Sequence, residues 1–340
     1  MKKIKIGQIG IGHNHGEAKM LAVRKFPELF EVVGFAEENE EWITKRGEKA
    51  GYQGLKRYTV DELIDKCDAL LIETDIWDLT ETAKKCVEKG KHIHLDKPAS
   101  GRLKEYKKVL DIAKSKNLVV QLGYMYRYNT AIKKCIDEAK RGKLGEIYSI
   151  NAEMSTFHKP NYKQWLANFK GGIMYILGSH MVDLIVYLLG EPKTVTSFLK
   201  HTNLDGIDFE DNNLAVLEYD KALARIYISS VEVNGFGRRQ FVVSGSKGTV
   251  DIKPIERPCI YNYSDTEIAN HCYSDLKVVE NIEEDSTNSR YDEMMQDFYA
   301  YIIGEKKNPF SYEHDYIVQK VLDKIVGGVD FNSKNQIENF

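Results

Sequence analysis

A glycine-rich turn between an apolar strand and a helix is the feature of this sequence that most restricts its fold. The apolar segment 4–9 precedes Gly10-Ile11-Gly12-His13-Asn14-His15-Gly16, and residues 17–26 have the pattern of a helix. Glycines at such a turn let the backbone approach a pyrophosphate, and the helix N-terminus supplies free N–H groups with a partial positive charge. The turn therefore predicts a dinucleotide site, to which we assign Gly10, Ile11, Gly12, His13 and Asn14.

An acidic residue follows the second predicted strand, as a dinucleotide site requires. Glu37 stands 25 residues after Gly12, directly after the strand candidate 30–36. A carboxylate there can bind both ribose hydroxyls and repels a 2′-phosphate, so the sequence favours NAD over NADP. One feature departs from the usual turn, because His15 takes the third glycine position and Gly16 follows one residue late. This displacement weakens the expectation of close helix–strand packing.

The pattern of predicted elements divides the chain into two domains. Strand candidates alternate with helix candidates as far as residue 123, which is typical of a parallel sheet covered by helices. After that point longer strand-like stretches predominate, at 146–156, 195–199, 213–218, 222–232 and 238–243. We therefore predict a Rossmann domain over residues 1–123 and a second domain over residues 124–340, with an antiparallel sheet and flanking helices.

Composition argues against several classes of function. The 48 basic and 51 acidic residues give a net charge of −3, which does not support a nucleic-acid partner. The longest fully apolar run, 184–189, is far too short to span a membrane. Five cysteines without a CxxC motif favour free thiols in a reducing cytoplasm. His13 and His15 have no evident third ligand in the sequence, so we expect no metal ion.

Several short motifs follow the glycine turn in a fixed order. They are Asp96-Lys97-Pro98, Tyr126-Arg127, Gly171-Gly172, the segment 178–183 (GSHMVD) and the segment 244–250 (SGSKGTV). Together they resemble the Gfo/Idh/MocA oxidoreductases over nearly the whole chain. The resemblance implies an α/β Rossmann domain followed by an α+β domain with a large open, mainly antiparallel sheet. It also implies use of NAD or NADP on a sugar or cyclitol, and a homodimer or homotetramer formed through the open sheet face.

The resemblance also suggests roles for individual residues. Lys97 matches the lysine of the family's Glu-Lys-Pro motif, and Asp96 stands in place of its glutamate. His180 matches the catalytic histidine, and Asp183 matches the acid three residues later. Thr74 matches the threonine of a loop over the cofactor. The resemblance thus assigns Lys97, His180 and Asp183 to catalysis, and adds Glu37, Thr74, Asp96 and Lys97 to the cofactor-binding residues.

The substrate side departs from the family at one position. Many of these dehydrogenases have an aspartate four residues before the histidine, where this chain has Ile176. In the loop-like stretch 155–165, His158 could replace the missing polar partner and Trp165 could stack on a sugar face. We assign Tyr126, Arg127, His158, Trp165 and Asp183 to substrate binding.

These assignments predict an NAD-dependent dehydrogenase that oxidises a secondary hydroxyl of a sugar or cyclitol, or reduces the ketone, with Lys97 and His180 handling the proton. One alternative is an enzyme that oxidises a glycoside transiently, eliminates its substituent and reduces the sugar again, so that NAD is recycled in place. Another is a non-catalytic regulatory protein on the same fold, because a fold alone does not establish activity.

Overall fold

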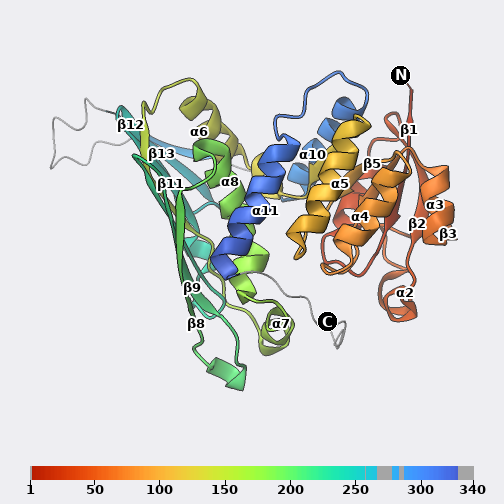
Figure 1. The fold of residues 1–340 in the computed structure, drawn as a ribbon, viewed down its shortest axis with the longest axis horizontal. Helices are drawn as coiled ribbons and strands as arrows, with labels where there is room; N and C mark the ends of the chain where they lie inside the picture. The colour runs from red at the N-terminus through yellow and green to blue at the C-terminus, as the bar shows by residue number, and fades with distance from the viewer. Residues whose placement is uncertain (1, 257, 266–277, 283–286, 328–340) are drawn as a thin grey trace. The chain divides into compact units, whose positions relative to one another are not determined.

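The structure of this chain is a computed structural model that describes residues 2–256, 258–265, 278–282 and 287–327. The chain forms two compact units (Figure 1). The first comprises Met1–Met125 and Ser286–Tyr316, and the second Tyr126–Asp285 and Ile317–Phe340. The first unit therefore contains a C-terminal segment besides the residues up to 125. No helix in the described ranges is long and apolar enough to cross a membrane.

A six-stranded parallel sheet forms the centre of the first unit, in the order β3-β2-β1-β4-β5-β6. The order reverses between β1 and β4, and ligands of such sheets bind outside the carboxyl ends of the strands at this reversal. The strands are β1 (Ile4–Ile9), β2 (Phe30–Ala36), β3 (Arg57–Tyr58), β4 (Ala69–Ile72), β5 (His92–Leu95) and β6 (Val120–Leu122).

Helices follow each of the first five strands, which confirms the alternation expected from the sequence. Thr59 opens α3 with a capping box, accepting from the backbone N–H of Glu62 while that side chain accepts from the Thr59 backbone. The C-terminal helix α10 packs against α1. The helices are α1 (Gly16–Arg24), α2 (Glu40–Arg46), α3 (Val60–Lys66), α4 (Leu79–Glu88), α5 (Leu103–Ser115) and α10 (Thr287–Ile302).

The second unit is built on an eight-stranded sheet in the order β14-β13-β12-β11-β7-β10-β9-β8. Only β7 and β10 pair in parallel, so the mainly antiparallel sheet is confirmed. The strands are β7 (Ile147–Glu153), β8 (Thr194–Lys200), β9 (Asn212–Glu218), β10 (Leu223–Ser229), β11 (Gln240–Gly245), β12 (Gly248–Ile252), β13 (Cys259–Asp265) and β14 (Val278–Ile282).

Helices lie along one face of this sheet (Figure 1). They are α6 (Thr130–Lys140), α7 (Pro160–Leu166), the π-helical turn Met174–Gly178, α8 (Ser179–Leu189) and the later part of α11 (Tyr312–Val326). Every second residue of the central strands is buried, including Ile150, Ala224 and Ile226. Residues 125–128, which include Tyr126 and Tyr128, form a 3₁₀ turn.

One sequence interpretation is wrong. The segment 160–166 is not a loop, because Pro160 starts a short helix.

Candidate functional site

The glycine turn has the close backbone contacts that a dinucleotide turn needs. Gly10 has φ +86°, and a Cβ at this position would lie 2.5 Å from the carbonyl oxygen of Glu73. A Cβ on Gly16, the first residue of α1, would lie 2.9 Å from Nε2 of Gln8 and 3.3 Å from Cβ of Glu73. Gly16 therefore lets helix α1 pack closely on β1 and β4. The displaced glycine performs the packing role that the sequence left in doubt.

Two residues of α2 that sequence analysis did not identify pack on this turn. A Cβ on Gly12 would lie 2.5 Å from Nε1 of Trp42, so the indole covers the glycine backbone. Trp42 is 5% exposed, and its Nε1 has no hydrogen-bond partner among the described residues. Arg46 lies over the ring at 4.9 Å and donates to the carbonyl oxygen of His13 and to Oδ1 of Asn14. An indole N–H and a guanidinium beside the turn add hydrogen-bond donors to a phosphate-binding backbone.

The predicted ribose-binding acid lies at the same turn. Oε2 of Glu37 accepts from the backbone N–H of Ile11 at 2.9 Å, and Oε1 accepts from that of Asn39. Burial, together with the negative charges of Asp78 and Glu37, raises the pKa of Asp75 to about 7. The backbone nitrogen of Thr74 lies 2.5 Å from a Cβ built on Gly10, so the Thr74 loop is next to the turn. The acidic groups of Glu37 and Asp75 are therefore close enough for their charges to interact beside the turn.

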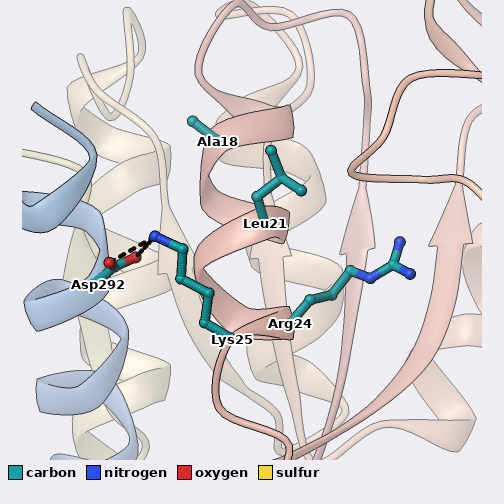
Figure 2. Close-up of a pocket in the computed structure, with 5 residues that line it drawn as sticks. All are labelled: Ala18, Leu21, Arg24, Lys25 and Asp292. Atoms are coloured by element: carbon teal, nitrogen blue, oxygen red, sulfur yellow. Dashed lines mark hydrogen bonds and ion pairs between the residues drawn. The ribbon is translucent and has the colours of Figure 1, made fainter.

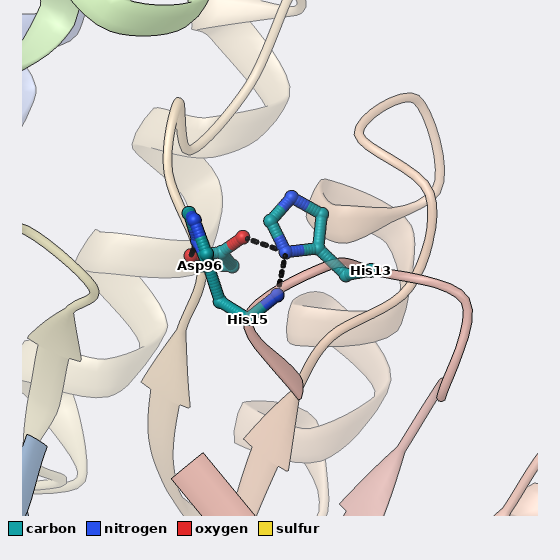
Figure 3. Close-up of side chains that lie close together, drawn as sticks. All are labelled: His13, His15 and Asp96. Carbon is teal, nitrogen blue, oxygen red and sulfur yellow. Dashed lines mark hydrogen bonds and ion pairs between the residues drawn. The ribbon is translucent and has the colours of Figure 1, made fainter. Parts of the chain in front are cut away.

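Asp96, at the end of β5, is the centre of a buried charged network. Its Oδ2 is 2.7 Å from Nδ1 of His13, and its Oδ1 accepts from Nζ of Lys19 at 2.8 Å. Lys19 also donates to Oε1 of Glu73 at 2.7 Å, and the side chains of all three charged residues are fully buried. His15 completes the group, with Nδ1 3.9 Å from Oδ1 of Asp96 (Figure 3). The fold thus directs Lys19, from an otherwise ordinary helix, into the site.

Burial and charge shift the pKa values within this network in opposite directions. Burial alone would raise the pKa of Asp96, but the charges of His13 and Lys19 outweigh it and hold that pKa well below its usual range. Burial raises the pKa of Glu73 to about 8, with Lys19 opposing the shift. Burial also lowers the pKa of His15 to about 4. At neutral pH, Asp96 is therefore ionised and His15 is neutral.

Lys97 directly follows Asp96, the central residue of this network, in the sequence. Its side chain is only 2% exposed. Its positive charge lowers the pKa values of both Glu73 and His15. Lys97 therefore belongs to the same group of residues as the glycine turn, at the carboxyl ends of the parallel strands.

His180, in the second unit, is held against an aromatic ring. The ring of Tyr126 meets that of His180 edge-on, with centroids 4.9 Å apart and planes at 72°. His180 is 2% exposed and lies in the first turn of α8, directly after the π-helical turn. Ile176 lies within that π-helical turn, so it does not have the regular α-helical spacing to His180. Single π-helical turns are frequent at functional sites.

The hydroxyl of Tyr126 is held by two charged residues that the sequence did not single out. It hydrogen bonds to Oε1 of Glu256 and accepts from NH1 of Arg239 at 3.1 Å. Nε of Arg239 donates to the carbonyl oxygen of Ser155 at 3.2 Å. Both charged side chains are buried. The Tyr126 side chain is therefore held at its hydroxyl as well as at its ring.

The predicted residues His158 and Trp165 are part of an aromatic row at α7. The ring of His158 stacks on Tyr162 with centroids 4.1 Å apart, and Tyr162 lies 5.2 Å from Trp165. Nε2 of His158 is buried without a hydrogen-bond partner among the described residues. Burial, followed by the charges of Arg239 and Lys163, lowers the pKa of His158 to about 4. His158 is therefore a neutral, half-buried imidazole with one polar atom available.

A shallow surface pocket lies elsewhere in the first unit (Figure 2). Its walls are Ala18, Leu21, Arg24 and Lys25 of the α1 segment and Asp292 of α10. Lys25 and Asp292 form an ion pair at 2.7 Å across it. None of these residues belongs to the network around Asp96.

The parallel sheet with its glycine turn, followed by an open antiparallel sheet, defines a two-domain oxidoreductase with a dinucleotide-binding Rossmann unit. The chain belongs to the Gfo/Idh/MocA oxidoreductase family. The family's NAD-binding Rossmann domain matches residues 4–124, and its C-terminal alpha/beta domain matches residues 133–327.

Individual relatives are distant. An uncharacterized oxidoreductase of Schizosaccharomyces pombe is 26% identical over 260 residues, covering 73% of this chain and 70% of the relative. Glucose-6-phosphate 3-dehydrogenase of Bacillus subtilis is 28% identical over 226 residues, covering 64% of this chain and 63% of the relative. The structure of a levoglucosan dehydrogenase in complex with NADH has a TM-score of 0.79 at 19% identity, with 96% of each chain covered.

Proposed function

We propose that this protein is an NAD-dependent dehydrogenase that oxidises a secondary hydroxyl of a sugar or cyclitol, or reduces the corresponding ketone. The observation that carries the proposal is the convergence of the glycine turn, Glu73 and Asp96-Lys97 at the carboxyl ends of β1, β4 and β5. Two relatives named as dehydrogenases of glucose 6-phosphate and levoglucosan support the substrate class.

The dinucleotide would be held by the turn Gly10–Asn14, by Glu37 at the ribose and by the Thr74 loop. When bound, its nicotinamide supplies the hydride acceptor. The acidic surroundings of Glu37 and Asp75 favour NAD over NADP, because a 2′-phosphate would be repelled there. Asp96 is engaged by His13 and Lys19, and we propose that it approaches the nicotinamide ribose once the dinucleotide is bound.

The proton of the hydroxyl must leave as the hydride leaves carbon. We assign His180 as the group that accepts it, since an imidazole exchanges protons near neutral pH. We assign Lys97 to donate a hydrogen bond to the same oxygen and stabilise its developing charge. Asp183, bonded to Arg127, positions the helix that carries His180. His158 and Trp165 offer a hydrogen bond and an aromatic face to the sugar.

Activity of single variants tests the assignment. Lys97→Ala and His180→Ala should each lower kcat by at least about a hundredfold on a responsive sugar or cyclitol. Binding of NADH, followed by its fluorescence, should change little in His180→Ala. Near-normal turnover in both variants would remove the proposed roles of Lys97 and His180, whereas absence of activity on every sugar and cyclitol tested would favour a non-catalytic protein on this fold.

The buried Ile176 favours a second candidate function. Without a carboxylate there, the chain lacks a group of the usual polyol site, and a transient oxidation with elimination and re-reduction becomes the alternative. Denaturing the purified protein after gel filtration and measuring the released nucleotide by mass spectrometry separates the two. Near-stoichiometric NAD(H) and net glycoside cleavage would support recycling, whereas an empty site and NADH release would support the dehydrogenase.

We further propose that the protein acts in the cytoplasm as a homodimer or homotetramer. The open face of the second unit's sheet carries partly exposed apolar residues, of which Phe198 and Leu223 are more than half exposed. Such a face supports association with a second copy.

A further inference from the structure

The fold supplies the third metal ligand that the sequence lacked. His13 and His15 are two residues apart in the turn. Asp96 follows the end of β5, far away in the sequence. One donor atom of each residue lies within 4.8 Å of the others. Figure 3 shows both imidazoles beside the Asp96 carboxylate. This juxtaposition exists only in the folded chain.

The donor set and its spacing suit a transition metal. Imidazole nitrogen and carboxylate oxygen are ligands of Zn²⁺ and Co²⁺, and donor atoms at about 2.1 Å from such an ion lie about 3.3 Å apart. Nδ1 of His13 lies 2.7 Å from Oδ2 of Asp96 and Nδ1 of His15 lies 3.9 Å from Oδ1, so both imidazoles approach the carboxylate at distances close to this spacing. A metal ion would lie between Nδ1 of His13 and the Asp96 carboxylate, which now approach each other to 2.7 Å.

The residues around the three ligands support the carboxylate and leave an entrance for an ion. Lys19 donates to Oδ1 of Asp96 at 2.8 Å, and a hydrogen bond of this kind orients a ligand. The same ammonium charge repels a cation, so we expect micromolar rather than nanomolar affinity. The side chains of His13 and His15 are 11% and 31% exposed, which gives an ion access from solvent.

We propose that His13, His15 and Asp96 form a binding site for a divalent transition-metal ion of the Zn²⁺ class. Three protein ligands leave at least one coordination position open. The site lies at the N-terminal end of α1, where the turn would hold a dinucleotide phosphate. We therefore expect the metal ion and the dinucleotide to compete, and this second part alone rests on the proposed function.

Calorimetric titration of the tag-free, nucleotide-stripped full chain with ZnCl₂ tests the site, and Co²⁺ absorption reports the ligand geometry. We expect one ion per chain, with the affinity weakened at least about tenfold in His13→Gln and in His15→Gln. The control is His201→Gln, which removes a histidine that contacts Asp208 at 2.5 Å but has no third ligand among the described residues. Circular dichroism verifies that each variant folds.

Absence of stoichiometric binding in the wild type would overturn the metal site, as would an unchanged affinity in both turn variants or an equal loss in His201→Gln. Competition is measured by repeating the Zn²⁺ titration at rising NAD. A Zn²⁺ affinity that weakens in proportion to the NAD concentration supports competition, and an unchanged Zn²⁺ affinity with NAD bound overturns competition. If NAD itself does not bind, the proposed function fails while the metal result still stands.

Discussion

Arg127 and Asp183 form a bidentate ion pair in the interior of the second unit. Nε of Arg127 donates to Oδ2 of Asp183 at 2.9 Å, and NH2 donates to Oδ1 at 2.6 Å. The two side chains are 2% and 1% exposed. The pair links the turn that carries Tyr126 to the helix that carries His180, so two residues assigned to substrate contact also hold the site together.

Breaking this pair from one side should be costly. Asp183→Asn leaves the Arg127 charge buried without its counter-ion, and we expect a loss of about 3–5 kcal/mol in the free energy of unfolding. Urea denaturation measures the loss. The double variant Arg127→Met/Asp183→Leu removes both charges and should recover part of it. Equal losses in the single and double variants would contradict a role for the charge pairing.

Cofactor preference should depend on the acids at the turn. Glu37→Ala removes the carboxylate that we propose repels a 2′-phosphate, so the ratio of NADP affinity to NAD affinity should rise about tenfold or more. Asp75→Asn should raise the same ratio by a smaller factor, because Asp75 lies close enough to Glu37 for their charges to interact. Fluorescence titration with NADH and NADPH gives both constants. An unchanged ratio in both variants would remove this explanation of NAD preference.

Trp42 should report on dinucleotide binding. Its indole lies in the direction that a Gly12 Cβ would take, where a dinucleotide phosphate approaches the turn. NADH should therefore quench tryptophan emission strongly, and Trp42→Phe should lose most of that quenching. Trp165→Phe, which alters the second unit, serves as the control and should keep it. Quenching that survives in Trp42→Phe would place the dinucleotide away from this residue.

His158 should make the protein less stable in acid. Its pKa of about 4 in the folded chain lies below the unfolded value of about 6.5, so the unfolded chain takes up a proton first as the pH falls. The stability linked to His158 is therefore present above pH 6.5 and is lost between about pH 6.5 and 4. Between pH 7 and 5 the wild type should lose about 2 kcal/mol more than His158→Gln. Parallel urea curves for the two proteins at both pH values would disprove the shift.

The open sheet face should mediate association. Register pairs Phe198 with Leu214 and Leu214 with Tyr227, so these side chains form a row across β8, β9 and β10. Phe198→Asp combined with Tyr227→Asp should convert an oligomer into monomers in light scattering after gel filtration. Leu204→Asp, at an equally exposed residue outside the sheet, should not. A monomeric wild-type protein would contradict the proposed association.

Local patterns in the sequence determined much of the first unit. The capping box at Thr59 and the end of α4 near Gly90 depend on contacts between near neighbours, and the strand predicted over 30–36 is confirmed. The glycine turn and the ordered motifs were sufficient to identify the family. The sequence does not distinguish the 3₁₀ turn at 125–128 from a strand, because three buried tyrosines stand at alternate positions.

The tertiary structure alone decided which polar groups meet. Lys19 resembles any helical lysine in the sequence, yet α1 directs it between Glu73 and Asp96, residues 54 and 77 positions away. Arg239 and Glu256 likewise converge on the hydroxyl of Tyr126 from distant segments. Propensity and periodicity describe the chain over one or two turns, whereas burial of a charge depends on partners that only long-range packing brings within hydrogen-bonding distance.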